Sequence, residues 1–175
     1  MTSSDETRLD EQRLEALRQS SVKVVEGGLD GAGLRIGVVA GRFNGGISQR
    51  LLDGVLRRAE SLGIGNADVS VSWVPGAFEL PIVAQKLCTS GSVDAVICLG
   101  AVIRGDTPHF DYVAGEAARG IQNVALTTGV PVIFGVLTTN TVEQALERCM
   151  DDDSNKGAEA LETAVETVRV LRRWS

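Results

Sequence analysis

The sequence contains only one histidine, His109, and only three cysteines among its 175 residues. The cysteines, Cys88, Cys98 and Cys149, form no C-x-x-C pair, which is typical of reduced thiols in a cytosolic protein. With a single histidine, a His/Cys zinc cluster cannot be built, and no motif points to a metal site made of carboxylates alone. We therefore expect a cytoplasmic protein without a metal.

Long apolar runs and an excess of basic residues are also absent. No hydrophobic stretch approaches the roughly 20 residues of a membrane span, and the N-terminus has neither a signal-peptide core nor the acid-poor composition of a transit peptide. The net charge of −6 argues against a nucleic-acid partner. An acidic protein can still bind a small anion through a local cluster of cations.

The chain divides into two parts by composition. Residues 1–20 form a polar extension with sparse leucines, which suits a frayed helix or a disordered tail. Residues 21–175 carry the patterns of a single globular domain, beginning with the short strand candidate "SVKVV".

Apolar strand and helix patterns alternate along this domain. The strand patterns are continuous rather than alternating, which is typical of parallel strands covered on both faces. We expect an α/β fold, a three-layer α/β/α sandwich with a four-stranded parallel sheet and flavodoxin-like winding. The expected strands are 34–40, 69–74, 93–103 and 131–139, and the expected helices are 47–62, 77–88, 108–127, 141–150 and 155–173.

In such folds ligands bind beyond the carboxyl ends of the strands. After the first strand, "GRFNGG" puts Phe43 where its ring can stack on a flat ligand, although a tight turn with Phe43 in the core would give the same pattern. After the second strand, "VPGAFELP" begins a helix. Glu79 in its first turn is either an acceptor for ligand hydroxyls or a partner of the helix dipole.

The segment after the third strand is "GDTPHFDY". Thr107 followed by Pro108 predicts a helix with Thr107 as N-cap and Pro108 as its first residue. The unpaired N–H groups and positive dipole end of such a helix form a natural phosphate site. His109 lies in the first turn, and an imidazole is the side chain that suits proton transfer near neutrality; the alternative is a solvated histidine with no role.

Two cations flank the acidic loop "CMDDDSN" near the C-terminus. Arg148 lies before it and Lys156 lies after it. Cations near helix ends commonly complement the helix dipole. The alternative is that the two residues clamp a phosphate.

Four motifs in order resemble the lumazine synthase family, which acts at the penultimate step of riboflavin synthesis. They are "GRFN", "VPGAFELP", "GAVIRGDTPHFDYV" and "PVIFGVLTT…EQALER", and the resemblance covers about residues 34–156. It implies a transferase that condenses 5-amino-6-(D-ribitylamino)uracil with 3,4-dihydroxy-2-butanone 4-phosphate. The product would be 6,7-dimethyl-8-ribityllumazine, with inorganic phosphate and water released and with no cofactor.

The resemblance also implies residue roles. Phe43 would stack on the pyrimidine, Glu79 would accept ribityl hydroxyls, and His109 would move protons. Phe134 and Arg148 would reach into the site of a neighbouring subunit, with Arg148 on the phosphate as a second catalytic residue. The other residues implied to line the pyrimidine and ribityl pocket are Asn44, Ala77, Phe78, Val102, Ile103 and Lys156, and those implied to hold the phosphate are Gly105, Asp106 and Thr107.

A site completed by a neighbour requires a homo-oligomer, and the resemblance implies a pentamer. The "SVKVV" strand would add to the sheet edge of the next subunit. The segment from Arg148 to Lys156 has the short spacing of relatives that close into a 60-subunit shell, but Asp151, Asp152 and Asp153 stand where those relatives have glycine and lysine. We expect pentamers, with shell closure favoured by high salt or phosphate.

Three other functions would use parts of the same pattern. The strand-end loops alone suit a flavin- or nucleotide-binding module without catalysis, but His109, Thr107 and Arg148 together exceed what a passive binder needs. An archaeal-type riboflavin synthase would dismutate two lumazines, and the full "GAVIRGDTPHFDY" match argues against it. A structural shell protein would form particles without turnover.

Overall fold

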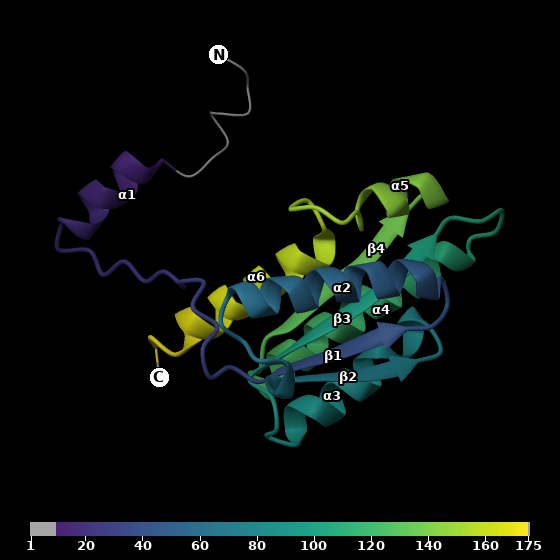
Figure 1. The fold of residues 1–175 in the computed structure, drawn as a ribbon, viewed down its shortest axis with the longest axis horizontal. Coiled ribbons are helices and arrows are strands. Elements are labelled where there is room, and N and C mark those ends of the chain that lie inside the picture. The colour runs from purple at the N-terminus through teal and green to yellow at the C-terminus, as the bar shows by residue number, and fades with distance from the viewer. Residues whose placement is uncertain (1–9, 175) are drawn as a thin grey trace, which may run out of the picture.

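A four-stranded, all-parallel sheet forms the centre of the molecule (Figure 1), as the continuous apolar runs predicted. The computed structural model describes residues 10–174. The strand order is β2-β1-β3-β4, so β2 and β4 are the edge strands. The strands are β1 Ile36–Gly41, β2 Val69–Val74, β3 Ala95–Ile103 and β4 Val132–Thr139.

Helices cover both faces of the sheet and complete the predicted three layers (Figure 1). Helices α2 (Gly45–Ser61) and α6 (Lys156–Leu171) pack against each other on one face. Helices α3 (Leu80–Thr89) and α4 (His109–Thr128) cover the other. The short α5 (Val142–Glu147) follows β4, and the 3-10 turns η1 (Asn66–Asp68) and η2 (Ala77–Glu79) precede β2 and α3.

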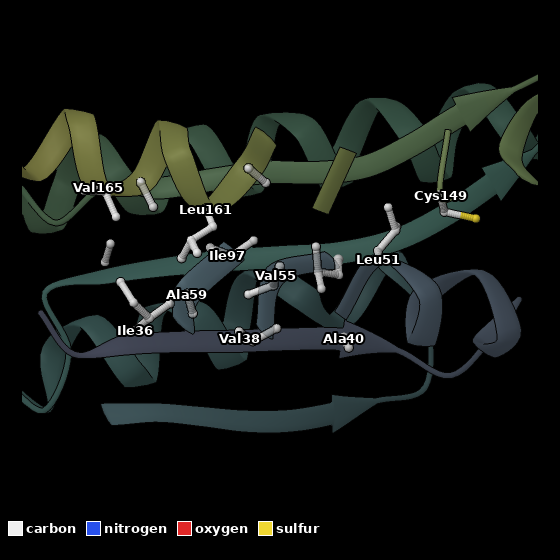
Figure 2. Packing of buried hydrophobic residues seen from close by; sticks show 14 of the residues in the cluster. Ile36, Val38, Ala40, Leu51, Val55, Ala59, Ile97, Cys149, Leu161 and Val165 are labelled. Atoms are coloured by element: carbon white, nitrogen blue, oxygen red, sulfur yellow. The ribbon is translucent and has the colours of Figure 1, made fainter. Parts of the chain in front are cut away.

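Each face of the sheet has its own hydrophobic core, because successive side chains of a strand point to opposite sides. Val38 and Ile97 pack with α2 and α6, as Figure 2 shows. Val39 and Cys98 pack with α3 and α4. Strand β3 is buried along almost its whole length, whereas the edge strand β2 is half-exposed.

Local residues explain where the main helices begin and end. In α2 the buried Ile47, Leu51, Val55 and Ala59 recur every four residues and form one stripe. Helix α4 ends at Gly129, whose φ of 70° lies in the left-handed region that favours glycine.

The N-terminal region differs in part from the predictions. Helix α1 (Glu11–Arg18) buries none of its side chains and lies away from the sandwich (Figure 1). Residues 1–9 lie outside the described part of the chain, and the division at residue 20 stays a prediction. The segment 21–25 forms neither helix nor strand in the single chain, so strand addition to a neighbour also stays a prediction.

Three further findings concern the helices and strands. Most helix and strand ends differ from the predicted ones by one to three residues, since terminal turns tighten or fray. The predicted Thr107 cap is wrong: α4 begins at His109, Pro108 occupies the cap position, and no side chain caps the helix. Within residues 10–174 no helix is both long enough and apolar enough to span a membrane.

Candidate functional site

Three loops meet at the carboxyl edge of the sheet and enclose a cavity of about 440 Å³. We call this cavity the first hollow. The loops follow β1, β2 and β3, which are neighbours in the sheet and therefore end at the same edge. The predicted site residues that line it are Phe43, Ala77, Phe78, Glu79, Val102, Ile103, Gly105, Thr107 and His109, and they are joined by Pro75, Gly76, Ala101, Phe110 and Val113.

Phe43 lies on the rim of the first hollow with 74% of its surface exposed. Its backbone N–H donates to the Pro75 carbonyl at 2.9 Å, and the Arg42 N–H donates to Val74 at 2.8 Å. These bonds continue the pairing of β1 with β2 past the strand ends and hold the loop in place. The interpretation of Phe43 as a core residue is therefore wrong, and its ring is available for stacking.

Asn44 supports the first hollow from behind and does not line it. Its backbone has a φ of 58°, a left-handed conformation that asparagine tolerates better than most residues. The side-chain Nδ2 donates to the Ala101 carbonyl at 2.9 Å. This bond ties the end of β1 to the end of β3, so Asn44 shapes the wall that the neighbouring Phe43 and Val102 present.

Glu79 has a structural contact and an open side. Its Oε2 accepts a hydrogen bond from the Gly76 N–H at 2.9 Å, which fixes the turn that leads into α3. Among the described residues no donor bonds Oε1, and the side chain lines the first hollow. Both interpretations of Glu79 from the sequence are compatible with this geometry, because a carboxylate accepts several hydrogen bonds at once.

The loop from β3 to α4 forms the polar end of the first hollow. Gly105 and Thr107 line it and are exposed, whereas Asp106 is exposed but does not line it. His109 is the first residue of α4 and also faces the cavity. The Asp111 N–H donates to the Pro108 carbonyl at 3.0 Å, but no side chain caps this helix, so the N–H groups of His109 and Phe110 keep their capacity to bind an anion.

Arg104 organises this loop, and the sequence interpretation assigned it no role. Its guanidinium donates from Nη2 to Asp111 Oδ1 at 3.0 Å and from Nε to Asn140 Oδ1 at 3.2 Å, and it lies 4.1 Å from the centroid of the Phe110 ring. These contacts join the start of α4 to the end of β4. A cation placed directly after a strand end was the available signal.

A second hollow of about 540 Å³ lies along the edge strand β4. Phe134 of β4 lines it with 42% of its surface exposed, together with Arg148 and Lys156. Both cations already have contacts within the chain. Arg148 Nη1 donates to the Gln144 carbonyl at 2.8 Å, and Lys156 Nζ lies 2.6 Å from both carboxylate oxygens of Glu159.

The two hollows share no lining residue. The single chain therefore brings the residues that follow β1, β2 and β3 together, and it brings Phe134, Arg148 and Lys156 together, but it does not join the two groups.

The three thiols do not contribute to either hollow. Cys88, Cys98 and Cys149 are all buried, and burial raises the pKa of the Cys98 thiol, which favours the unreactive protonated form. Within residues 10–174 no group of three or more His, Cys, Asp or Glu side chains is arranged to hold a metal ion.

A comparison with family models agrees with the family to which the motifs point. The model of the 6,7-dimethyl-8-ribityllumazine synthase family matches residues 33–172, which covers all four strands and both hollows. The chain belongs to the 6,7-dimethyl-8-ribityllumazine synthase family, a family of transferase-type enzymes of riboflavin biosynthesis.

Proposed function

We propose that the protein condenses 5-amino-6-(D-ribitylamino)uracil with 3,4-dihydroxy-2-butanone 4-phosphate to form 6,7-dimethyl-8-ribityllumazine, with release of phosphate and water. The observation that carries the proposal is the first hollow, which groups an exposed aromatic ring, a carboxylate and the single histidine of a chain from this family. Its volume lies within the range of about 300–1,000 Å³ that is usual for small-molecule sites.

The apolar end of the first hollow suits the pyrimidine. The exposed ring of Phe43 stacks on one face of the heterocycle, and Val102 and Ile103 at the end of β3 form the opposite wall. Oε1 of Glu79 accepts hydrogen bonds from the ribityl hydroxyls while Oε2 keeps its bond to Gly76. Ala77 and Phe78 complete the wall, and Asn44 holds it through Ala101.

The polar end suits the phosphate of the four-carbon substrate. The loop of Gly105, Asp106 and Thr107 leads into the uncapped N-terminus of α4, where N–H groups and the dipole favour an anion. A Cβ added to Gly105 would meet no atom within 4 Å, so the backbone there is open to a ligand.

His109 lines the polar end of the first hollow and moves the protons of the reaction. The uracil amine attacks the ketone and loses water to form an imine. Removal of a proton from the neighbouring carbon then expels the phosphate, and ring closure releases a second water. Holding both substrates against one another supplies much of the acceleration, and His109 carries protons between the steps.

Residues of the second hollow complete the site from a second copy of the chain. Arg148 of the partner subunit reaches the phosphate, and Phe134 and Lys156 of the partner subunit close the pocket. The separation of the two hollows in one chain supports this arrangement, because neither alone holds both the aromatic pocket and the cations. Large apolar side chains that are exposed in the single chain also favour an interface: Phe43, Phe78, Ile82, Tyr112, Leu126 and Phe134.

A pentamer is the proposed assembly. The open edge of β2 can receive the 21–25 segment of a neighbour, which has no strand partner in its own chain. Of the acidic residues that oppose shell closure, Asp151 forms an ion pair with Arg57 at 2.6 Å. This contact removes part of the like-charge repulsion that the sequence predicts, and it favours closure into a 60-subunit shell when salt or phosphate screens the rest.

The test is to mix the purified protein with both substrates and to follow the fluorescence of the lumazine, with each substrate omitted in turn as the control. Light scattering on the same sample measures the particle mass across ionic strength. Binding of flavin without lumazine formation would replace the proposal with a passive flavin module. Riboflavin formed from lumazine alone would replace it with a riboflavin synthase, and particles without any turnover would replace it with a shell protein.

A further inference from the structure

The loop between α5 and α6 is fixed by one buried polar residue, Asn155, which is 1% exposed. Its side chain uses every hydrogen-bonding group that an amide offers. Nδ2 donates to the Met150 carbonyl at 2.8 Å and to the Arg50 carbonyl at 3.1 Å. Oδ1 accepts from the Gly157 N–H at 2.8 Å and from the Ala158 N–H at 3.4 Å.

These four bonds have different consequences. The two accepted bonds cap the start of α6, as asparagine commonly does. The two donated bonds do something that a cap does not require: they tie the loop to its own Met150 and to Arg50 in α2.

The tied loop carries the two cations of the second hollow at its ends. The Lys156 N–H donates to the Arg148 carbonyl at 2.9 Å, so the two backbones are joined directly. Arg148 follows α5, which packs against β3 and β4 and buries Ala145, and the loop that Asn155 anchors begins directly after Arg148. The position of the Arg148 backbone beside β4 thus depends in part on where Asn155 anchors the loop.

Gly54 of α2 faces Asn155, and its lack of a side chain leaves space for the amide. A Cβ on Gly54 would collide with Oδ1 of Asn155, and a Cβ on Gly157 would collide with the Leu51 carbonyl. Helices α2 and α6 approach closely at these two glycines. The space between them fits the side chain of Asn155 but no side chain at position 54 or 157.

We infer that Asn155 is a positioning residue that holds the backbone of Arg148 where its side chain, once released from Gln144, reaches the phosphate of the four-carbon substrate. The inference rests on the proposed function, in which Arg148 contacts that phosphate. It predicts that loss of the two donated bonds weakens binding of one substrate only.

The test uses Asn155→Ser, which keeps a good helix cap but loses both Nδ2 donations. The KM for 3,4-dihydroxy-2-butanone 4-phosphate is expected to rise about fivefold, with the KM for the uracil unchanged. Asn155→Asp, which has the same shape and keeps both cap acceptors, gives the same pattern and serves if the serine variant folds poorly. Asp94→Asn, at the opposite end of the sheet, is the control for lost stability and leaves both KM values unchanged.

A double-mutant cycle with Arg148→Ala shows whether Asn155 acts through Arg148. In an Arg148→Ala background, Asn155→Ser is expected to have almost no further effect on the KM for the phosphate substrate, because the group it positions is gone. A full additional fivefold effect in that background, or an equal rise in both KM values, would overturn the inference. If Arg148→Ala alone left that KM unchanged, the proposed role of Arg148 would fail instead, so the two failures are distinguishable.

Discussion

The first and the second hollow differ in how their functional groups are engaged. In the first hollow the Phe43 ring is exposed, Glu79 keeps one oxygen open, and α4 has no side-chain cap. In the second hollow, Arg148 already donates to Gln144 and Lys156 already pairs with Glu159. These groups of the first hollow are open to a ligand, whereas an anion at the second hollow would have to displace the partner that each cation has within the chain.

The largest expected effect separates chemistry from binding in the first hollow. His109→Ala is expected to lower kcat by about 10- to 100-fold, since a positioned acid–base group contributes at or above that range and positioning alone sustains the remainder. KM values for both substrates should change little. Steady-state lumazine fluorescence measures this, and full turnover by the variant from mildly acid to mildly alkaline pH would exclude His109 from proton transfer.

A smaller change in kinetics is expected from a substitution in the second hollow. Arg148→Ala is expected to raise the KM for the butanone phosphate about tenfold, because a charge-assisted bond typically contributes about 1.5–3 kcal/mol and Arg148 must first leave Gln144. The uracil should bind as in the wild type. Equal weakening for both substrates would show that the change disrupts an interface and not a phosphate contact.

A still smaller change in KM is expected when the unbonded oxygen of Glu79, Oε1, is replaced. Glu79→Gln keeps an oxygen for the Gly76 N–H, so the thermal midpoint should not move. With that oxygen used by Gly76, the open oxygen of Glu79 is replaced by an NH2 group, which donates hydrogen bonds and does not accept them, and the KM for the uracil should rise about fivefold. A lower thermal midpoint with unchanged KM would assign Glu79 to the turn alone.

Asp94, which lines neither hollow, should affect stability and not activity. Its burial raises the pKa, but the side-chain and backbone hydrogen bonds from Arg35 and the charges of Arg35 and Arg172 outweigh burial and leave the pKa below its ordinary value of 3.8. The native state thus binds this proton less tightly than the unfolded state. The stabilisation is full above the ordinary pKa and is lost as the pH falls through the native one.

Arg35→Met removes the main partner of that carboxylate. The variant should be less stable than the wild type near neutrality, and the difference should shrink as the pH falls below 3.8. Urea unfolding at several pH values measures it, with lumazine formation at neutral pH as the control. A difference that stays constant down to strongly acid pH would show that Arg35 stabilises the fold by packing only.

The sequence predicted the sheet well because the central strands β1 and β3 carry no charged or hydroxyl side chain and are buried almost throughout, whereas the edge strand β2 carries two serines. It also placed the loops of the first hollow, since parallel strands end at one edge. It failed where a contact is distant in the chain. Nothing in the neighbouring sequence shows that Asn44 bonds Ala101 or that Asn155 bonds Arg50. The cap predicted at Thr107 failed for a local reason: Pro108 takes the cap position, and no side chain caps the helix.

The order of the strands also determines when the chain can fold during its synthesis. Ile36 pairs with Val69 on one side and with Ala95 on the other, so β1 stays half-paired until β3 has left the ribosome. The face that holds Leu161 and Val165 stays uncovered until α6 follows. At about 5–20 residues per second, this leaves apolar strands exposed for several seconds, and such non-local pairing folds slowly. Until α6 is complete, the growing chain therefore exposes unpaired strand edges of the kind that aggregate.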